Sequence, residues 1–225
     1  MRQNVRITKR EIKEDKFATF VLVAKDYVVE RWTYFAISAA AIIVVIVAFT
    51  LIRSSQSSQE GEALQTYNRA LSELRSANFQ LAIVDFKTVL DQYGSSSLAE
   101  PAAFNLGNAH FGATNFAEAK VAFEDYLKRY PGNKFFVTSA MAGVAASLAG
   151  LGETKAAADK FRETAEKYPD FKLAGEYYLK SLEYYIKANE MESAKVILAK
   201  LTKDYQGTRY YMEGARLAAE HGLRL

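Results

Sequence analysis

Apolar and polar residues are unevenly distributed along the chain, and the longest uninterrupted apolar run lies near its beginning. Residues 32–52 read WTYFAISAAAIIVVIVAFTLI and contain no charged residue, Gly or Pro. At about 1.5 Å per residue, a helix of this length spans the roughly 30 Å hydrocarbon core of a bilayer. Trp32 and Tyr34 lie at one end, and Arg31 and Arg53 flank the run, as is typical of membrane interfaces. The pattern predicts a transmembrane helix over residues 32–52.

The segment before this run is basic, and the segment after it is not. Residues 1–31 contain eight Lys or Arg residues, whereas residues 53–67 contain one, Arg53. A cleaved signal peptide fits poorly, because 31 residues precede the run and no small-x-small site follows it. Since positively charged flanks stay in the cytoplasm, the asymmetry predicts a single-pass inner-membrane protein with a cytoplasmic N-terminus and a periplasmic distal part.

The basic arm, residues 1–31, also shows a helical pattern. Its apolar residues recur at spacings of mostly three and four, with Lys residues between them: Ile12, Phe17, Phe20, Val21, Ala24 and Val28. This spacing predicts an amphipathic helix. Such a helix can be an interfacial anchor or a docking helix. We favour the simpler interpretation that it leads into the span, because basic flanks commonly only hold topology.

Beyond a polar linker at residues 53–59, the apolar pattern repeats every 37 or 38 residues. Three columns keep this register: Ala82, Ala119, Ala157 and Ala194; Phe86, Phe123, Phe161 and Leu198; and Tyr93, Tyr130, Tyr168 and Tyr205. Each period contains two helical patterns, and Gly or Pro follows each of these Tyr residues within two positions, where a helix must stop. The pattern predicts four stacked helix pairs over residues 60–206 and an end helix over Thr208 to Leu223.

These repeats resemble the tetratricopeptide repeat family. The family has a small residue at the eighth position, Ala at the twentieth, an aromatic residue at the twenty-fourth and Pro at the thirty-second. The matching residues are Gly107, Ala119, Phe123 and Pro131 in the second repeat, and Ala145, Ala157, Phe161 and Pro169 in the third. The resemblance implies an all-α, right-handed helix-turn-helix solenoid over residues 60–225. The arm, span and repeats together resemble bacterial inner-membrane repeat proteins related to the ancillary subunit of the Sec translocon.

Composition and candidate chemistry narrow the function classes. The 225 residues include no Cys, so none of them forms a disulfide, a thiolate metal site, a cysteine nucleophile or a lipidated cysteine. His110 and His221 have no carboxylate or second His at helical ligand spacing, so we expect packing or surface roles. Basic and acidic residues are equal in number after residue 31, which argues against nucleic-acid binding. We expect no enzyme activity, metal, cofactor or small-molecule substrate.

The resemblance also implies a groove on the first helix of each repeat, apolar with acidic spots. Its positions hold Phe104, Asn108 and Phe111; Ser139, Ala142, Ala146 and Ala149; and Glu176, Leu179, Glu183 and Ile186. Tyr178 and Tyr185 fall on core positions, which leaves Tyr177 and Tyr184 as candidates for contact with a partner. The candidate partner-binding residues are therefore Phe104, Asn108, Phe111, Tyr177, Leu179, Glu183 and Tyr184.

Two function classes follow from this organisation. The groove lacks a basic ladder for a peptide carboxylate, so an apolar extended or helical protein segment is the expected ligand. The leading hypothesis is a membrane-anchored scaffold that binds exported polypeptides or subunits of an envelope complex. The alternative is an accessory subunit of one membrane complex, with the repeats as a rigid spacer and Ser38, Ala39, Ala40 and Ala41 as a helix-packing face.

Overall fold

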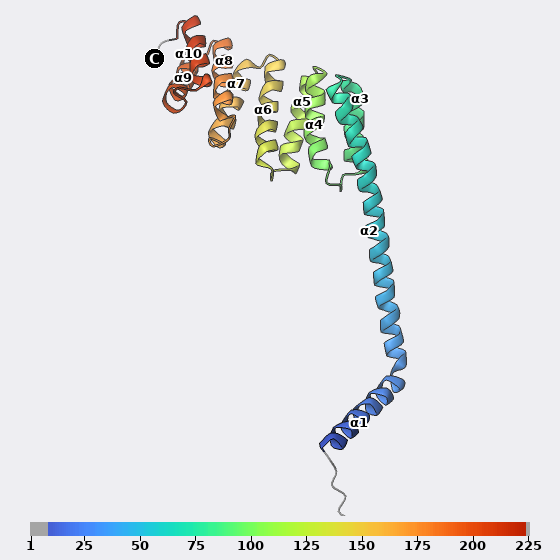
Figure 1. Cartoon of the computed structure of the whole chain (residues 1–225). Helices are drawn as coiled ribbons and strands as arrows, with labels where there is room; N and C mark the ends of the chain where they lie inside the picture. Colours follow the sequence, from blue (N-terminus) through green and yellow to red (C-terminus); the bar gives the residue numbers. More distant parts are fainter. Residues whose placement is uncertain (1–8, 224–225) are drawn as a thin grey trace, which may run out of the picture. The chain divides into compact units, whose positions relative to one another are not determined.

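The chain divides into two compact units, Met1–Ser57 and Ser58–Leu225 (Figure 1). The computed structural model describes the backbone of residues 9–223, and their side chains except those of residues 9–15, 28, 35, 51, 52 and 54–57. Throughout this described range the regular elements are helices, with no strand. Residues 1–8 of the basic arm, which include Arg2 and Arg6, lie outside the described residues.

The first unit contains α1 (Lys9–Glu30) and the beginning of α2 (Trp32–Arg75). The predicted helix in the arm is confirmed, but its single apolar face is not. Phe17 and Phe20 are exposed, and so are Leu22 and Val29, which point away from the predicted stripe at 100° per residue. Apolar residues therefore occur on more than one side of α1, and the prediction of an amphipathic helix was wrong in this respect.

The apolar beginning of α2 has the length and composition of a membrane span. The window Trp32–Thr50 has 19 residues and a mean hydropathy of 2.3, and none of it is buried by the rest of the chain. Ile42, Val44 and Phe49 are each more than half exposed. A helix this long and apolar can cross a membrane.

The polar segment 53–59 is helical in the structure, because α2 continues through it to Arg75. Gln is a good helix former and Ser is only moderately unfavourable in helices, and the segment contains no Gly or Pro to end one. The end of α2 instead forms the first helix of the first repeat. The boundary between the two units, Ser57 and Ser58, falls within this segment, so a linker between the span and the repeats stays a prediction.

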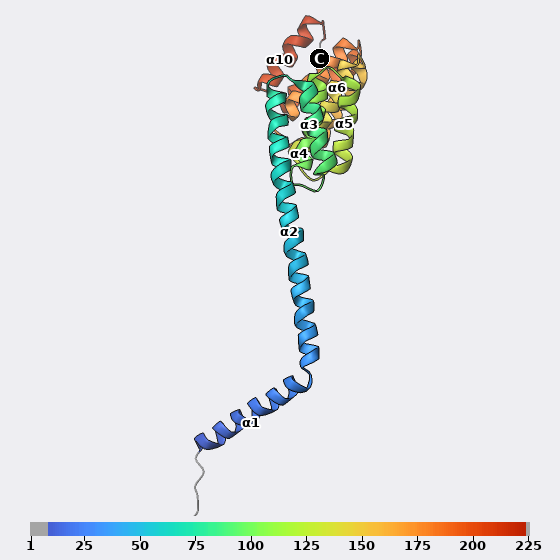
Figure 2. The ribbon, with the colours of Figure 1, turned by 90° about the vertical axis from the view of Figure 1, so that its right-hand side faces the viewer.

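The second unit is a stack of antiparallel helix pairs, as Figure 1 shows for α4 to α7; Figure 2 gives the view turned by 90°. Each helix packs against the next from α3 to α9, and α10 packs against α8 and α9. The helices after α2 are α3 (Phe79–Gln92), α4 (Ala99–Gly112), α5 (Phe116–Arg129), α6 (Lys134–Gly150), α7 (Thr154–Lys167), α8 (Ala174–Lys187), α9 (Met191–Asp204) and α10 (Arg209–Glu220). The predicted all-α solenoid of four repeats with an end helix is confirmed.

The three repeated columns occupy equivalent places in the stack. The four Ala residues of the first column are fully buried, and Phe86, Phe123, Phe161 and Leu198 are at most 6% exposed. Tyr93, Tyr130, Tyr168 and Tyr205 are the C-caps of α3, α5, α7 and α9. The sequence period therefore corresponds to one helix pair.

Small residues in the first helices allow close approach of the aromatic rings. A Cβ atom at Gly107 would lie 2.6 Å from the Phe123 ring, and a Cβ atom at Gly143 would also lie 2.6 Å from it. The ring is therefore enclosed between the backbones of α4 and α6.

One turn geometry recurs between the two helices of every repeat. Ala77, Thr114, Gly152 and Asn189 have φ values between 58° and 81°, in the left-handed region. After each of them, the next backbone N–H donates to a carbonyl five residues earlier, as from Asn115 to His110 at 3.0 Å. This is the Schellman arrangement that closes a helix.

Candidate protein-binding face

The predicted groove positions form one partly exposed surface, which we call the first-helix face. It comprises Leu64, Tyr67, Leu71 and Leu74 of α2, the predicted positions of α4 and α6, and Glu176, Leu179 and Glu183 of α8. All of these residues are partly or largely exposed, whereas the predicted Ile186 is 6% exposed and belongs to the core. The face is apolar at most positions, and acidic residues occur at its α8 end.

Phe104 and Phe111 differ in how much surface they offer. Phe104 is partly buried, and its ring centroid lies 5.9 Å from that of Phe123 and 5.0 Å from that of Phe136. Phe111 is 38% exposed, and its ring meets Phe116 edge-on at 5.4 Å. Phe104 thus contributes to the core as well as to the face, while Phe111 is the more available anchor.

Asn108 ends a short polar network within this apolar surface. Its Nδ2 donates to Oδ1 of Asn105 at 3.1 Å, and Nδ2 of Asn105 donates to the Tyr67 hydroxyl at 3.1 Å. Burial raises the pKa of the Tyr67 hydroxyl, so it stays neutral and can accept this bond. The network fixes the Asn108 amide beside Phe111, where it can bond to the backbone of a bound segment.

The structure corrects the prediction for Tyr177 and limits that for Tyr184. Tyr177 is 7% exposed because its ring stacks near Phe161 at 6.3 Å and Phe171 at 6.4 Å. Burial, with the nearby Glu176 carboxylate, raises the Tyr177 pKa to about 12. Tyr184 is partly buried and stacks parallel to Phe161 at 5.8 Å. The prediction that Tyr177 contacts a partner was wrong, since an aromatic cluster already covers it. The core positions predicted for Tyr178 and Tyr185 are confirmed, at 2% and 0% exposure.

Leu179 and Glu183 line a pocket of about 310 Å³ between α8 and α10. Lys180 donates to Glu183 at 3.0 Å and Lys187 donates to it at 2.7 Å. Burial alone would raise the pKa of the Glu183 carboxyl, but the hydrogen bonds from Lys187 and Lys180 outweigh it and hold the pKa below its ordinary value. Glu183 therefore remains a carboxylate at neutral pH, although its charge is already satisfied within the chain.

The two histidines occupy different environments. His221 is exposed, and its Nδ1 lies 3.0 Å from the Leu217 carbonyl oxygen. His110 is 8% exposed, and its Nδ1 has no hydrogen-bond partner. Burial, and next the charge of Lys87, lower the pKa of His110 below its ordinary value. No cluster of three His, Asp or Glu residues in the described part of the chain could hold a metal ion.

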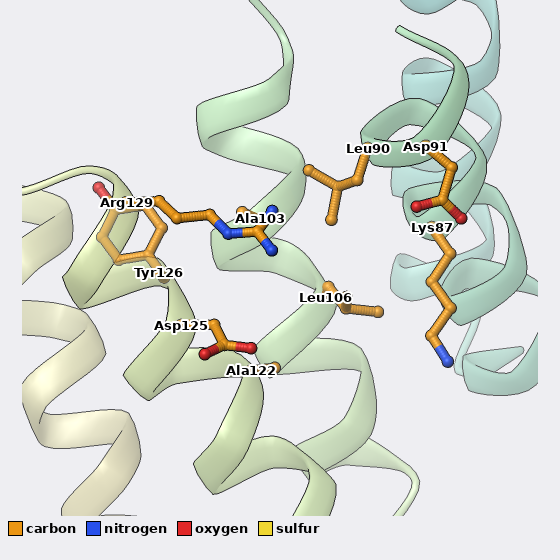
Figure 3. Close-up of a pocket in the computed structure, with 9 residues that line it drawn as sticks. All are labelled: Lys87, Leu90, Asp91, Ala103, Leu106, Ala122, Asp125, Tyr126 and Arg129. Carbon is orange, nitrogen blue, oxygen red and sulfur yellow. The ribbon is translucent and has the colours of Figure 1, made fainter. Parts of the chain in front are cut away.

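A second hollow lies between α3 and α5, over α4 (Figure 3). Sequence patterns did not identify it, because its lining side chains belong to three helices and include both apolar and charged residues. A hollow of about 280 Å³ recurs at the equivalent place between α7 and α9, where Tyr178 is among the lining residues.

Comparisons with known proteins bear on the repeat unit. A family model described as YfiO, outer membrane lipoprotein, matches residues 59–213. A crystal structure of a tetratricopeptide repeat protein from Parabacteroides merdae ATCC 43184 aligns with a TM-score of 0.58 at 14% identity. That alignment covers 71% of this chain and 60% of the other, so this chain spans less than two thirds of it, and the likeness shows the fold alone. No curated protein matches the sequence. The predicted tetratricopeptide fold is confirmed, while the likeness to ancillary Sec subunits stays a prediction.

Proposed function

The chain belongs to the family described as YfiO, outer membrane lipoprotein, and from this premise we propose that it is a membrane-anchored scaffold that binds protein segments on its first-helix face. Tetratricopeptide arrays bring partners together through extended surfaces of stacked helices. The observation that carries the proposal is the row of partly exposed apolar side chains on the first helices, with the Asn108 amide fixed among them. Contiguous exposed apolar surface commonly marks a protein–protein contact site.

We propose that α2, rather than a lipid, anchors the protein. None of the 225 residues is a Cys, so none of them can carry a lipid on cysteine. The family match begins at residue 59, after the apolar window Trp32–Thr50. The basic arm supports a cytoplasmic N-terminus and a periplasmic repeat unit at the inner membrane.

The lack of Cys makes the proposed orientation directly testable. Gln80 on α3 and Lys16 on α1 are exposed, and each can be replaced by a single Cys. Membrane-impermeant maleimide added to spheroplasts should label Gln80→Cys, and should label Lys16→Cys only after lysis. The opposite labelling pattern would show that the orientation is reversed. Labelling of both variants in intact spheroplasts would contradict the proposed membrane span.

The binding role is tested by purification in mild detergent. Phe111→Ser with Asn108→Ala should abolish recovery of partner proteins while lowering the thermal midpoint only slightly, because both side chains are partly exposed. Val196→Ser is the matched control, since Val196 is 63% exposed on α9, away from the first-helix face. Many substoichiometric partners support the scaffold, whereas a single stoichiometric complex that survives the double substitution supports an accessory subunit.

A further inference from the structure

The loops that join one repeat to the next share one edge of the repeat unit, which we call the tyrosine-loop edge. It comprises residues 93–98, 130–133, 168–173 and 205–208, each beginning at one of the repeated Tyr residues. The first of these loops lies beside the first residues of the unit, because the Tyr93 hydroxyl donates to Glu62 at 3.0 Å. The Ser97 hydroxyl likewise donates to Glu60. The repeat unit therefore begins at this edge.

Contacts between helix ends place the next two loops along the same edge. Near the end of α5, the Tyr126 hydroxyl donates to Glu100 in the first turn of α4 at 2.9 Å. In the first turn of α6, the ring centroid of Phe135 lies 6.1 Å from that of Phe171, in the loop before α8. The first three loops of the edge thus form one row.

The beginning of this edge is tethered close to the apolar run of α2. Ser58 is the first residue of the repeat unit and comes six residues after Ile52. Since a chain extends by at most about 3.6 Å per residue, the beginning of the unit lies within about 22 Å of the end of the run. With α2 as the proposed membrane anchor, the tyrosine-loop edge therefore begins within reach of the bilayer surface.

Two neighbouring loops of the edge carry exposed cations and an exposed ring. We call this group the basic-aromatic cluster: Arg129, Lys134, Phe135, Lys167 and Lys172. Its four cations are exposed, and the ion pairs of the described residues include none of them. The Phe135 side chain is 49% exposed. Asp170 is the one carboxylate within residues 129–135 and 167–172, so the cluster is strongly basic.

The repeat fold itself does not require this cluster. The outer loops of the edge, residues 93–98 and 205–208, contain no charged residue. α6 has 17 residues, whereas α4 and α8 have 14 each, and its longer beginning holds Lys134 and Phe135. The Asn133 side chain caps this turn, because it accepts from the backbone N–H of Phe135 at 3.1 Å. The exposed ring is therefore held on a fixed turn at the edge.

We propose that the basic-aromatic cluster binds anionic phospholipid headgroups of the membrane that α2 spans, with Phe135 inserted at the interface. The inference rests on the proposed anchor. Lys and Arg are attracted to anionic lipid surfaces, and a Phe beside them adds apolar burial at the headgroup boundary. A bilayer is favoured over a soluble acidic protein because α2 already holds this edge within reach of the bilayer. The contact gives the repeat unit a second attachment to the membrane.

The test uses the full chain in lipid nanodiscs, with a fluorophore on one introduced Cys. Because the chain has no Cys, each variant carries a single label. Gly132→Cys places it beside the cluster, where nothing lies within 4 Å of the Cβ position, and Ser76→Cys places it on the exposed turn at the opposite edge. Lipids with a headgroup nitroxide should quench the Gly132→Cys label strongly in discs of equal parts phosphatidylglycerol and phosphatidylcholine. They should quench it less in phosphatidylcholine discs, and the Ser76→Cys label little in either.

Two kinds of variant locate the contact. Lys134→Gln with Lys172→Gln should lower the ratio of docked to free edge by about 25-fold, at about five-fold per charge, and so reduce quenching in the anionic discs. Lys87→Gln with Lys155→Gln is the matched control, since both side chains are exposed outside the edge, and it should leave quenching unchanged. Phe135→Ser should reduce quenching in both kinds of disc. The Lys variants alter only exposed charges, so they keep the test informative if Phe135→Ser impairs folding.

Three results would overturn this inference alone. One is equal quenching of the Gly132→Cys label in anionic and neutral discs. Another is unchanged quenching after Lys134→Gln with Lys172→Gln, which would mean that α2 alone brings the edge near the lipid. The third is no quenching in discs that hold the chain, which would leave the cluster to a soluble acidic partner. A chain that does not enter the discs would overturn the proposed anchor, and this inference with it.

Discussion

Thr114 adopts a backbone conformation that suits Gly better than a β-branched residue. Its φ is 58°, and Gly152 holds the equivalent place in the next repeat with a φ of 81°. For L-residues this region is unfavourable, and more so for a side chain branched at Cβ. The same turn is therefore built with strain in one repeat and without it in another.

We predict that Thr114→Gly stabilises the repeat unit by about 0.5–1 kcal/mol, because relief of left-handed strain exceeds the added chain entropy. Gly152→Ala should destabilise it by about 1 kcal/mol for the converse reason. Urea unfolding followed by circular dichroism measures both. Gly132→Ala is the control, since nothing lies within 4 Å of its Cβ position and its φ is not positive. A loss of stability in Thr114→Gly would contradict the turn geometry.

His110 makes the stability of the repeat unit depend on pH. Because burial lowers the pKa of His110 below 6.5, the unfolded chain takes up a proton at a higher pH than the folded chain. The free energy of unfolding is therefore highest, as far as His110 is concerned, above pH 6.5. It decreases as the pH falls below that value toward the folded pKa.

His110→Leu, which copies Leu148 of the next repeat, should therefore flatten the stability profile below pH 6.5 and raise stability at the acid end. It also removes the unpaired Nδ1, whose burial costs about 1–3 kcal/mol. The profile is obtained from urea midpoints at each pH, with the exposed His221→Leu as the control. An unchanged slope in His110→Leu would show that other groups cause the acid sensitivity.

At the scale of the helices, the contact between α4 and α6 depends on two glycines and one ring. A methyl group at Gly143 would lie 2.6 Å from Phe123, and the backbone at Gly107 prevents the ring from retreating. Gly143→Ala should destabilise the repeat unit by about 1–3 kcal/mol, the usual cost of overpacking. Ala146→Ser, partly exposed on the same helix, should change the urea midpoint little. Equal midpoints for the two variants would mean that α4 and α6 separate easily.

Periodicity predicted the helix pairs because each repeat must bury one face, and burial restricts residue type at fixed spacing. It did not predict that α2 continues through residues 53–59, since polarity alone does not end a helix. It also missed the burial of Tyr177, whose cover comes from Phe171 in the loop before α8, a contact that spacing within a helix does not encode. The hollow between α3 and α5 was missed for a related reason, because its lining side chains come from three different helices.

At the scale of the whole repeat unit, α10 covers the apolar surface of the last helix pair, α8 and α9. A Cβ atom at Gly214 would lie 2.9 Å from Leu201 and 3.4 Å from Leu182, and both Leu side chains are fully buried. Truncation after Gly207 should cost at least about 3 kcal/mol by uncovering them.

The loss should be local, because each repeat of a solenoid contacts only its neighbours. Hydrogen exchange should therefore show reduced protection in α8 and α9, with little change in α3 to α5. A uniform loss of protection across the unit would contradict repeat-by-repeat stability.

The rate at which the enclosed ring of Phe123 flips can report on motions of the stack. A phenyl ring between two backbones has no room to rotate by 180°, so each flip requires α4 and α6 to move apart for a moment. The flip rate then reports how often neighbouring repeats open, a motion on the microsecond to millisecond scale. With the ring labelled, exchange broadening of its NMR lines measures this rate, and flipping too fast to broaden them would show that the stack opens freely. Slow flipping of Phe123 would therefore show that neighbouring repeats of the stack rarely separate at this contact.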